Sequence, residues 1–263
     1  MAIHSRRSPV NFPGPVVFAV ALALASATGA SADSLNVVAG DSTWHAFQTP
    51  STSGLPGAAF WNNSSYDGAN RDCNIGYWLS GLGGCSANGG TFYNSSPRVT
   101  PPYLGDANTR FGFAKDAASS SVTVTTQVQT TAWYPGNEFG WYQVSDPTQL
   151  FPLFGRFLPA DGAATFVPSG DYGFYISSRH GTYLSDRTQG TQSHFAVFKL
   201  AGNGHYMVGS EDMWYGSDWD YNDMVLNVQI NEVPEPVTLV LVGTGLLGLL
   251  GRRNRGRSVG TRP

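Results

Sequence analysis

The residues with the clearest chemical potential lie close together in one acidic stretch between Gly209 and Gln229. Hard cations such as Ca²⁺ take about six to eight oxygen ligands from carboxylates, amides and backbone carbonyls, and one acidic loop can supply about three or four of them. We therefore predict a calcium site in this stretch. The predicted ligands are Asp212, Asp218, Asp220, Asn222 and Asp223. Glu211 directly precedes the first of them and is not itself a predicted ligand.

The predicted site is not an EF-hand. Counted from Asp218, the sixth position is Asp223 where a glycine is needed, and the twelfth is Gln229 where a bidentate glutamate is needed. A simple turn, in which Asp and Asn side chains bond their own backbone, would give the same pattern and stays open as the alternative. Repulsion among the three aspartates 218, 220 and 223 favours the cation, because their charges must be neutralised.

Signs of catalysis are weaker. The sequence contains no Gly-x-Ser-x-Gly elbow, no His-Glu-x-x-His and no phosphate-binding Gly-rich loop before a helix. Glu138 could act as an acid, but a glycosidase needs two carboxylates across a cleft. The histidines His45, His180, His194 and His205 are scattered. We expect structural or surface roles for His194 and His205, which lie in predicted strands. The sequence thus predicts no enzymatic activity, with a secreted polysaccharide-modifying hydrolase as the alternative.

The aromatic residues point to another function. All 7 Trp and all 12 Tyr lie between residues 33 and 232. Neighbouring side chains of a strand point to opposite faces, so one member of each adjacent aromatic pair should face outward or into a loop. These pairs are Trp133-Tyr134, Trp141-Tyr142 and Trp214-Tyr215. Exposed rings of this kind can stack on sugars, so we expect a surface that binds extracellular polysaccharide.

The elements that must position these residues have the pattern of β-strands. Alternating runs bounded by Gly, Pro, Asn or Asp occur at 110–115, 121–133, 138–144, 172–177, 194–200, 205–209 and 224–230. In the clearest of them, Val122, Val124 and Val128 share one face. No stretch between residues 33 and 232 has convincing apolar recurrence at helical spacing. The pattern predicts an all-β fold, an antiparallel β-sandwich or jelly-roll-like domain.

Residues 50–108 differ from the rest, because Gly, Asn, Ser and Pro dominate them. We expect long loops with short strands there. The only two cysteines, Cys73 and Cys85, lie in this region, and in an exported protein they should form a disulfide that contributes about 3 kcal/mol. Two free buried thiols are the alternative.

The C-terminal stretch places three different segments in order. Pro234-Glu235-Pro236 is a stiff, extended spacer. The uncharged segment 237–250 follows, and as a helix it would span about 21 Å, less than the roughly 30 Å of a bilayer core. The arginines after it are nevertheless typical of a helix end held in the cytoplasm, so we predict a short transmembrane helix. These arginines are Arg252, Arg253, Arg255 and Arg257.

This order resembles the PEP-CTERM protein-sorting signal of exopolysaccharide-producing Gram-negative bacteria. The resemblance implies that an exosortase, a membrane-embedded cysteine transpeptidase, recognises Pro234, Glu235 and Pro236 and that the tail is then removed. Arg252 and Arg253 belong to the same signal, and an unprocessed tail anchor is the alternative. The acidic stretch resembles a recurring ending of exported bacterial β domains, many of them with PEP-CTERM tails, which suggests a calcium loop before the last strand.

Residues 1–32 have the features of an export signal, with Arg6 and Arg7, an apolar segment at 16–25 and the small residues Ala30-Ser31-Ala32 before a cleavage site. We expect export by the general secretion machinery and cleavage by signal peptidase before Asp33; an uncleaved anchor is the alternative. The region 33–232 then holds 8 Lys and Arg against 17 Asp and Glu, a net charge of −9. This acidity argues against nucleic acid and anionic membrane surfaces as partners.

The expected organisation is a signal peptide at 1–32, an exported β-sandwich domain at 33–231, a sorting signal at 232–257 and a tail at 258–263. The C-terminal helix would hold the protein transiently in the inner membrane. The protein would then reach the cell surface or the extracellular matrix. There we expect a structural or glycan-binding component, stabilised by calcium.

Overall fold

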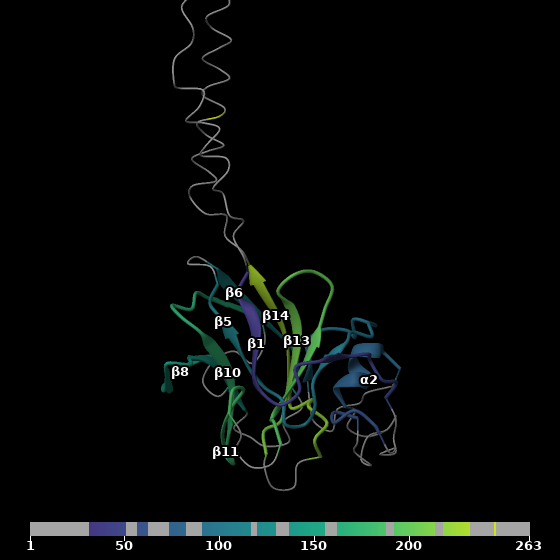
Figure 1. Ribbon diagram of the computed structural model, residues 1–263. Helices are drawn as coiled ribbons and strands as arrows, with labels where there is room; N and C mark the ends of the chain where they lie inside the picture. Colours follow the sequence, from purple (N-terminus) through teal and green to yellow (C-terminus); the bar gives the residue numbers. More distant parts are fainter. Residues whose placement is uncertain are drawn as a thin grey trace, which may run out of the picture. The chain divides into compact units, whose positions relative to one another are not determined.

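The computed structural model describes residues 32–50, 57–62, 74–82, 91–116, 120–129, 137–155, 162–187, 192–213 and 218–231, together with Gly245. The chain from Ser31 to Val233 forms one compact unit, which holds every strand in these residues. All strand pairs are antiparallel, and they form two sheets (Figure 1). The fold is therefore all-β, as the alternating sequence pattern predicted.

The first sheet has six strands. Its spatial order is β1 (Ser34–Ala39), β5 (Arg110–Ala114), β10 (Tyr172–Ser178), β7 (Glu138–Gln143) and β8 (Asp146–Gly155), with β11 (Gly181–Leu184) paired to β10. The edge strand β8 contains Pro147 and Pro152, which an edge tolerates because a proline cannot donate a ladder hydrogen bond.

The second sheet has eight strands. Its spatial order is β2 (Trp44–His45), β4 (Tyr103–Leu104), β12 (Phe195–Lys199), β13 (His205–Ser210), β14 (Met224–Asn231), β6 (Ser121–Gln129) and β3 (Thr91–Phe92), with β9 (Ala163–Phe166) paired to β6. At its centre β13 pairs with β14 from His205↔Gln229 to Ser210↔Met224. This hairpin positions the acidic stretch, because residues 211–223 connect its two strands.

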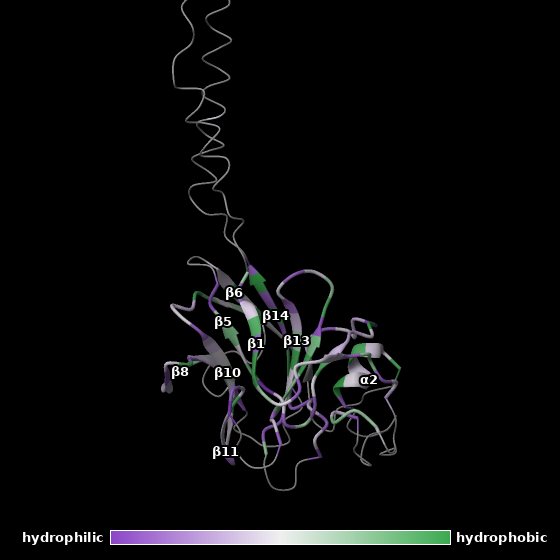
Figure 2. Cartoon of the chain, viewed as in Figure 1, coloured by the Kyte–Doolittle hydropathy of each residue, from purple (hydrophilic) through white to green (hydrophobic). Residues whose placement is uncertain are grey.

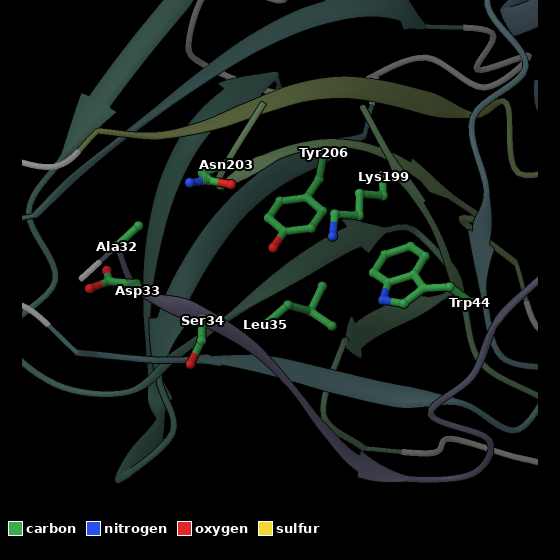
Figure 3. A pocket seen from close by; sticks show the side chains of 9 residues that line it. Ala32, Asp33, Ser34, Leu35, Trp44, Lys199, Asn203 and Tyr206 are labelled. Atoms are coloured by element: carbon green, nitrogen blue, oxygen red, sulfur yellow. The ribbon is translucent and has the colours of Figure 1, made fainter. Parts of the chain in front are cut away.

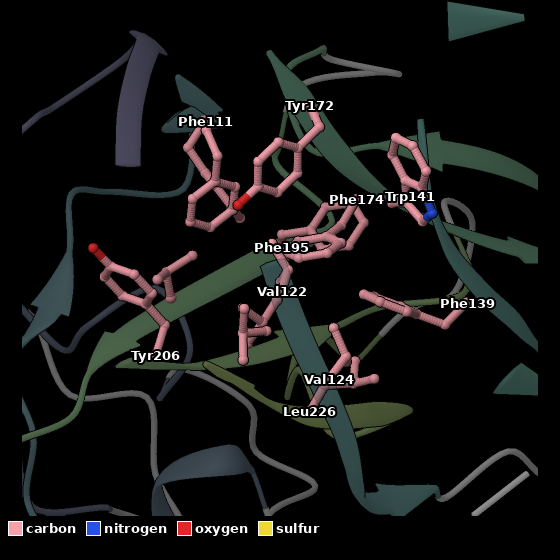
Figure 4. Packing of buried hydrophobic residues seen from close by; sticks show 14 of the residues in the cluster. Phe111, Val122, Val124, Phe139, Trp141, Tyr172, Phe174, Phe195, Tyr206 and Leu226 are labelled. Atoms are coloured by element: carbon pink, nitrogen blue, oxygen red, sulfur yellow. The ribbon is translucent and has the colours of Figure 1, made fainter. Parts of the chain in front are cut away.

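The main core contains buried side chains from both sheets. Phe111, Phe139 and Phe174 come from the first sheet, and Val124 and Leu226 come from the second (Figure 4). Each fully buried side chain of this size contributes about 1.5–3 kcal/mol. The shared core makes the two sheets a β-sandwich.

A second apolar cluster covers the outer face of the second sheet. The helix α2 (Ile75–Ser80) contributes Ile75, Trp78 and Leu79, which pack with Phe198 and Val225 of the sheet. Figure 2 shows hydrophobic positions, in green, on this helix. We call this helix, with the segment 57–62, the outer layer. The centre of the second sheet is therefore buried on both faces.

The helix corrects the prediction that residues 50–108 hold only loops and short strands. Asn74 caps its first turn by accepting a hydrogen bond from the Tyr77 N–H at 3.1 Å, and Gly81 ends it with a left-handed φ of 67°. A helix of 6 residues gives too few apolar positions for its period to be recognised in the sequence.

The predicted aromatic surface at Trp141-Tyr142 is wrong. Trp141 is 8% exposed and stacks on Phe151 and Phe166, while Tyr142 is fully buried and its hydroxyl donates to the Asp186 carboxylate at 2.5 Å. Strand β7 is covered on both faces, so both rings are buried and neither offers a stacking surface. The pairs Trp133-Tyr134 and Trp214-Tyr215 lie outside the described residues.

Candidate metal site

The acidic stretch is folded back on itself at one end of the β13–β14 hairpin. Glu211 and Asp212 follow β13 directly, and Asp223 directly precedes β14. Because Ser210 and Met224 are paired partners, the two ends of the stretch are held side by side. We call this region, residues 211–213 and 218–223, the acidic end of the hairpin.

Three carboxylates converge at the acidic end. One side-chain oxygen from each of Glu211, Asp218 and Asp220 lies within 4.8 Å of the other two. Glu211 and Asp220 are each only 1% exposed, and Asp218 is half-buried. Three oxygens at this spacing match what a single calcium loop can supply.

The backbone around Asp220 has an unusual conformation. Trp219 and Tyr221 both adopt left-handed φ values, 56° and 58°, although neither is a glycine. Such conformations cost about 1–3 kcal/mol each and persist only where the surroundings fix them. Here the Tyr221 N–H donates to Glu211 Oε1 at 2.5 Å, and the Asp220 carbonyl accepts from the Ile75 N–H at 2.9 Å. The helix α2 therefore helps to hold the loop.

Asn222 orients Asp220. Its backbone N–H donates to Asp220 Oδ1 at 3.1 Å, and its side-chain amide donates to Asp220 Oδ2. This is the local turn that the sequence offered as the alternative to a metal loop. The turn is therefore present in the structure. It orients the Asp220 carboxylate, which converges with the carboxylates of Glu211 and Asp218.

Asp212 and Asp223 form a second set of carboxylates next to the first. Asp223 Oδ2 accepts a hydrogen bond from the Asp212 N–H at 2.8 Å, and Asp212 Oδ2 accepts one from the Asn137 amide at 2.8 Å. The pKa of Asp223 is raised well above its ordinary value. Burial is the largest cause, and the negative charges of Glu211, Asp212 and Asp218 add to it. The acidic end thus favours a bound proton or a bound cation.

The predicted ligand set was incomplete. Glu211 belongs to the converging group, but the sequence analysis named it only as an upstream neighbour, although the adjacent Asp212 was a predicted ligand. The two strand-like runs on either side of the stretch could have indicated its role. If they pair as an antiparallel hairpin, Glu211 at the end of the first strand lies close to the residues just before the second strand. His194, expected to be structural, lies against the same residue: its Nδ1 is 3.0 Å from the Glu211 carbonyl oxygen, and its ring stacks on Tyr183.

The candidate catalytic acid Glu138 has a structural partner. It accepts a hydrogen bond from the Tyr175 hydroxyl at 2.9 Å across β7 and β10. Burial is the main cause that raises the pKa of Tyr175 above its ordinary value, and the hydrogen bond to the negatively charged Glu138 carboxylate adds to it. The pair joins two central strands of the first sheet.

Several predicted site residues lie outside the described residues. They are the cysteines Cys73 and Cys85 and the sorting residues Pro234, Glu235, Pro236, Arg252 and Arg253. Of the predicted membrane segment 237–250, only Gly245 is described. Within the part of the chain that the structure describes, no helix combines the length and the apolar character needed to cross a bilayer.

Comparison with known families identifies two parts of the chain. The folded part defines an antiparallel β-sandwich with an acidic loop before its last strand, and its residues 153–231 match a domain of unknown function (DUF4114). Residues 232–255 match the PEP-CTERM protein-sorting motif, which confirms the resemblance noted in the sequence. The chain therefore carries the tail of an exported, exosortase-sorted protein destined for the cell surface or the extracellular space.

Comparison with individual proteins adds little. No curated protein matches the chain. Among solved structures, the Chromobacterium violaceum lectin CV2L in complex with alpha-methyl-fucoside is similar at 17% identity, over 46% of this chain and 96% of the lectin chain. The TM-score of 0.28 is too low to establish a common fold or to carry an argument about ligands.

Proposed function

We propose that the protein is a non-catalytic component of the cell surface or of the extracellular polysaccharide matrix, with a structural or glycan-binding role, and that calcium stabilises its exported domain. Residues 33–231 would remain outside the cell after signal peptidase and the exosortase have acted at the two ends. Before processing, the segment 237–250 would anchor the chain in the membrane, with Arg252 and Arg253 on the cytoplasmic side.

The convergence of Glu211, Asp218 and Asp220 is the observation that supports calcium. These carboxylates come from both ends of the acidic stretch, so an ion bound among them would link the end of β13 to the start of β14. The raised pKa of Asp223 adds support, because a divalent cation would offset the negative charge around it. Calcium fits better than magnesium, since Mg²⁺ requires a nearly ideal octahedron and keeps several waters.

Thermal unfolding of the exported, processed protein tests the calcium site. A ligand that binds only the folded state at about 100 times its Kd adds about 2.7 kcal/mol, which for a domain of this size raises Tm by roughly 5–10 °C. We expect this rise with Ca²⁺ and its loss with a chelator. Equal Tm values with Ca²⁺ and with the chelator would remove the metal from the proposal.

Two matched variants assign the effect to the acidic end. Asp220→Asn removes one of the three converging charges and should abolish most of the Tm rise. Asp146→Asn is the control, because Asp146 is exposed at the start of β8 and its carboxylate accepts hydrogen bonds from the backbone N–H and the hydroxyl of Thr148, two residues away. An equal calcium response in Asp220→Asn and the wild type would mean that the ion binds elsewhere.

Incubation with polysaccharide from the same cells separates binding from hydrolysis. A binding component should be retained on the polysaccharide without changing its chain length. Shortened chains, measured by size-exclusion chromatography, would favour the hydrolase instead.

A further inference from the structure

A pocket of about 310 Å³ lies at the opposite end of the β13–β14 hairpin from the acidic stretch. Its walls come from the start of β1, from β2, from the end of β12 and from the turn that leads into β13 (Figure 3). The volume is at the lower end of the range typical of small-molecule sites, and it suits one ring of sugar size. We call this opening the β1–β13 pocket.

The pocket has an apolar wall. Trp44 and Tyr206 lie within 15° of parallel with ring centroids 6.4 Å apart, and Leu35 lies beside them. Trp44 is only half-buried, so part of its ring faces the opening. A flat aromatic surface of this kind accommodates the C–H face of a pyranose ring.

Polar groups surround this wall. Tyr206 is 8% exposed, and among the residues that the structure describes none forms a hydrogen bond with its hydroxyl. Burial raises the pKa of Tyr206, so this hydroxyl stays protonated and can both donate and accept a hydrogen bond. The exposed amide of Asn203 lies at the rim of the same pocket. A buried hydroxyl facing an opening is expected to bind a polar ligand or solvent.

The charge of the pocket is positive at its mouth. Lys199 is exposed, and its Nζ lies 5.9 Å from the centroid of the Trp44 ring. Asp33, which also lines the pocket, is paired with Lys115 at 3.8 Å, and its side chain is fully buried. Within the described residues, no carboxylate forms an ion pair with Lys199. The ammonium group beside the tryptophan ring is thus placed to attract an anion.

We propose that the β1–β13 pocket binds a uronic acid residue of an acidic polysaccharide. The pyranose ring lies on Trp44, the carboxylate pairs with Lys199, and the ring hydroxyls bond to Tyr206 and Asn203. This inference rests on the proposed function and deepens it, because it names the sugar class and the site. An acidic domain that binds an acidic polymer needs such a local positive charge, since its net charge of −9 otherwise repels the polymer.

Binding of uronic acid oligosaccharides to the exported, processed protein tests the proposal by isothermal titration calorimetry, with neutral oligosaccharides of equal length for comparison. We expect Trp44→Ala to weaken binding at least about tenfold, because it removes the stacking surface. Lys199→Gln should weaken it about fivefold and should reduce its salt dependence. Arg179→Gln, which removes an exposed charge on the β10–β11 turn outside the pocket, is the matched control and should bind as the wild type does.

Three outcomes separate this proposal from the proposed function. Preferential uronate binding that Trp44→Ala and Lys199→Gln both weaken, at unchanged Tm and calcium response, supports the pocket. Retention of the wild type on the cells' polysaccharide with equal retention of both variants overturns the pocket and leaves the glycan-binding function standing. Failure of the wild type to bind any glycan, neutral or acidic, overturns both the pocket and the glycan-binding role, and leaves only the structural role and the calcium site. Asp220→Asn serves as a further control for uronate that binds through calcium at the acidic end instead of in the pocket. In that case Asp220→Asn would lose uronate binding, and Trp44→Ala and Lys199→Gln would keep it.

Discussion

The two ends of the β13–β14 hairpin differ in how they are covered. At the acidic end, the carboxylates of Glu211 and Asp220 are buried, and the outer layer lies over the neighbouring part of the sheet. At the other end, the polar residues Asn227 and Gln229 of β14 are half-buried, and the β1–β13 pocket opens to solvent beside Lys199. We call this second end the tail end, because β14 continues there toward the sorting motif.

This difference can be followed along a single strand. Met224, Val225 and Leu226 are buried one after another, whereas from Asn227 to Asn231 buried and half-buried residues alternate. A strand covered on both faces has an apolar residue at each position, and a strand with one solvated face alternates. The same strand therefore supports a closed, structural site at one end and an open surface suited to an external ligand at the other.

Trp61→Ala should have the largest effect. It should lower both the stability of the domain and the calcium affinity of the acidic end. Trp61 is fully buried in the outer layer, where it packs on Phe198 with ring centroids 5.4 Å apart. Its removal should lower the free energy of unfolding by about 3–5 kcal/mol. Because the outer layer donates the Ile75 N–H to the Asp220 carbonyl, calcium affinity should fall as well. Urea unfolding and calcium titration of the folded variant measure the two effects.

The control for this prediction is another tryptophan. Trp141→Ala removes a ring from the main core, where it stacks on Phe151 at 4.3 Å and Phe166 at 4.6 Å. It should cost a similar free energy of unfolding. Calcium affinity should change much less, since Trp141 packs on Phe151 and Phe166 in the main core and belongs to a different apolar cluster from the outer layer. If both variants lose calcium affinity equally, the outer layer has no special role at the acidic end.

Two glycines of the hairpin allow the ends to be compared by the same substitution. A Cβ at Gly209, near the acidic end, would lie 2.4 Å from the Tyr221 carbonyl oxygen and 2.5 Å from Ile75 Cδ1. Gly209→Ala should therefore cost about 1–3 kcal/mol and weaken calcium binding. Gly204, at the tail end, has a left-handed φ of 62°, so Gly204→Ala should cost about 1–2 kcal/mol through backbone strain. In calcium titrations, Gly204→Ala should keep the wild-type affinity and Gly209→Ala should not. If both variants lost calcium affinity, the effect of Gly209→Ala would not be local to the acidic end.

The strands that alternate most clearly were predictable from sequence. Strands β10 and β14 lie within a residue of where the pattern placed them. Strand β6 was placed correctly at its start, but its predicted apolar face was wrong: Val122 and Val124 lie in the main core, whereas Val128 packs in the second cluster. A register shift against Val225 and Leu226 turns Val128 to the other face of the sheet. Strand β8 was missed, because its two prolines and its half-exposed residues hide the alternation of an edge strand. The helix α2 was missed because it is held by packing on the sheet, which a short sequence window does not contain.

The candidate sites differ in the same way. The acidic stretch stood out in the sequence because Asp212, Asp218, Asp220 and Asp223 lie within twelve residues. Glu211, next to Asp212, was not among the predicted ligands, although its carboxylate converges with those of Asp218 and Asp220. The β1–β13 pocket was not found, because Leu35, Trp44, Lys199 and Tyr206 come from strands far apart in the chain. Their chemistry becomes visible only when strand pairing brings them together.

Asp33→Asn should give the smallest effect and should show whether the tail end is independent of the acidic end. Asp33 Oδ1 accepts hydrogen bonds from Ser120 Oγ at 2.5 Å and from the Asp116 N–H at 3.2 Å, which an asparagine oxygen can retain. The charge that pairs with Lys115 is lost, but Lys115 Nζ keeps the Ser120 carbonyl at 2.9 Å, so we expect a loss of about 1 kcal/mol. Tm should fall by the same few degrees with calcium and with chelator, because a carboxylate at the tail end does not contribute to the ion site. A larger fall in calcium than in chelator would show that the two ends of the hairpin are coupled.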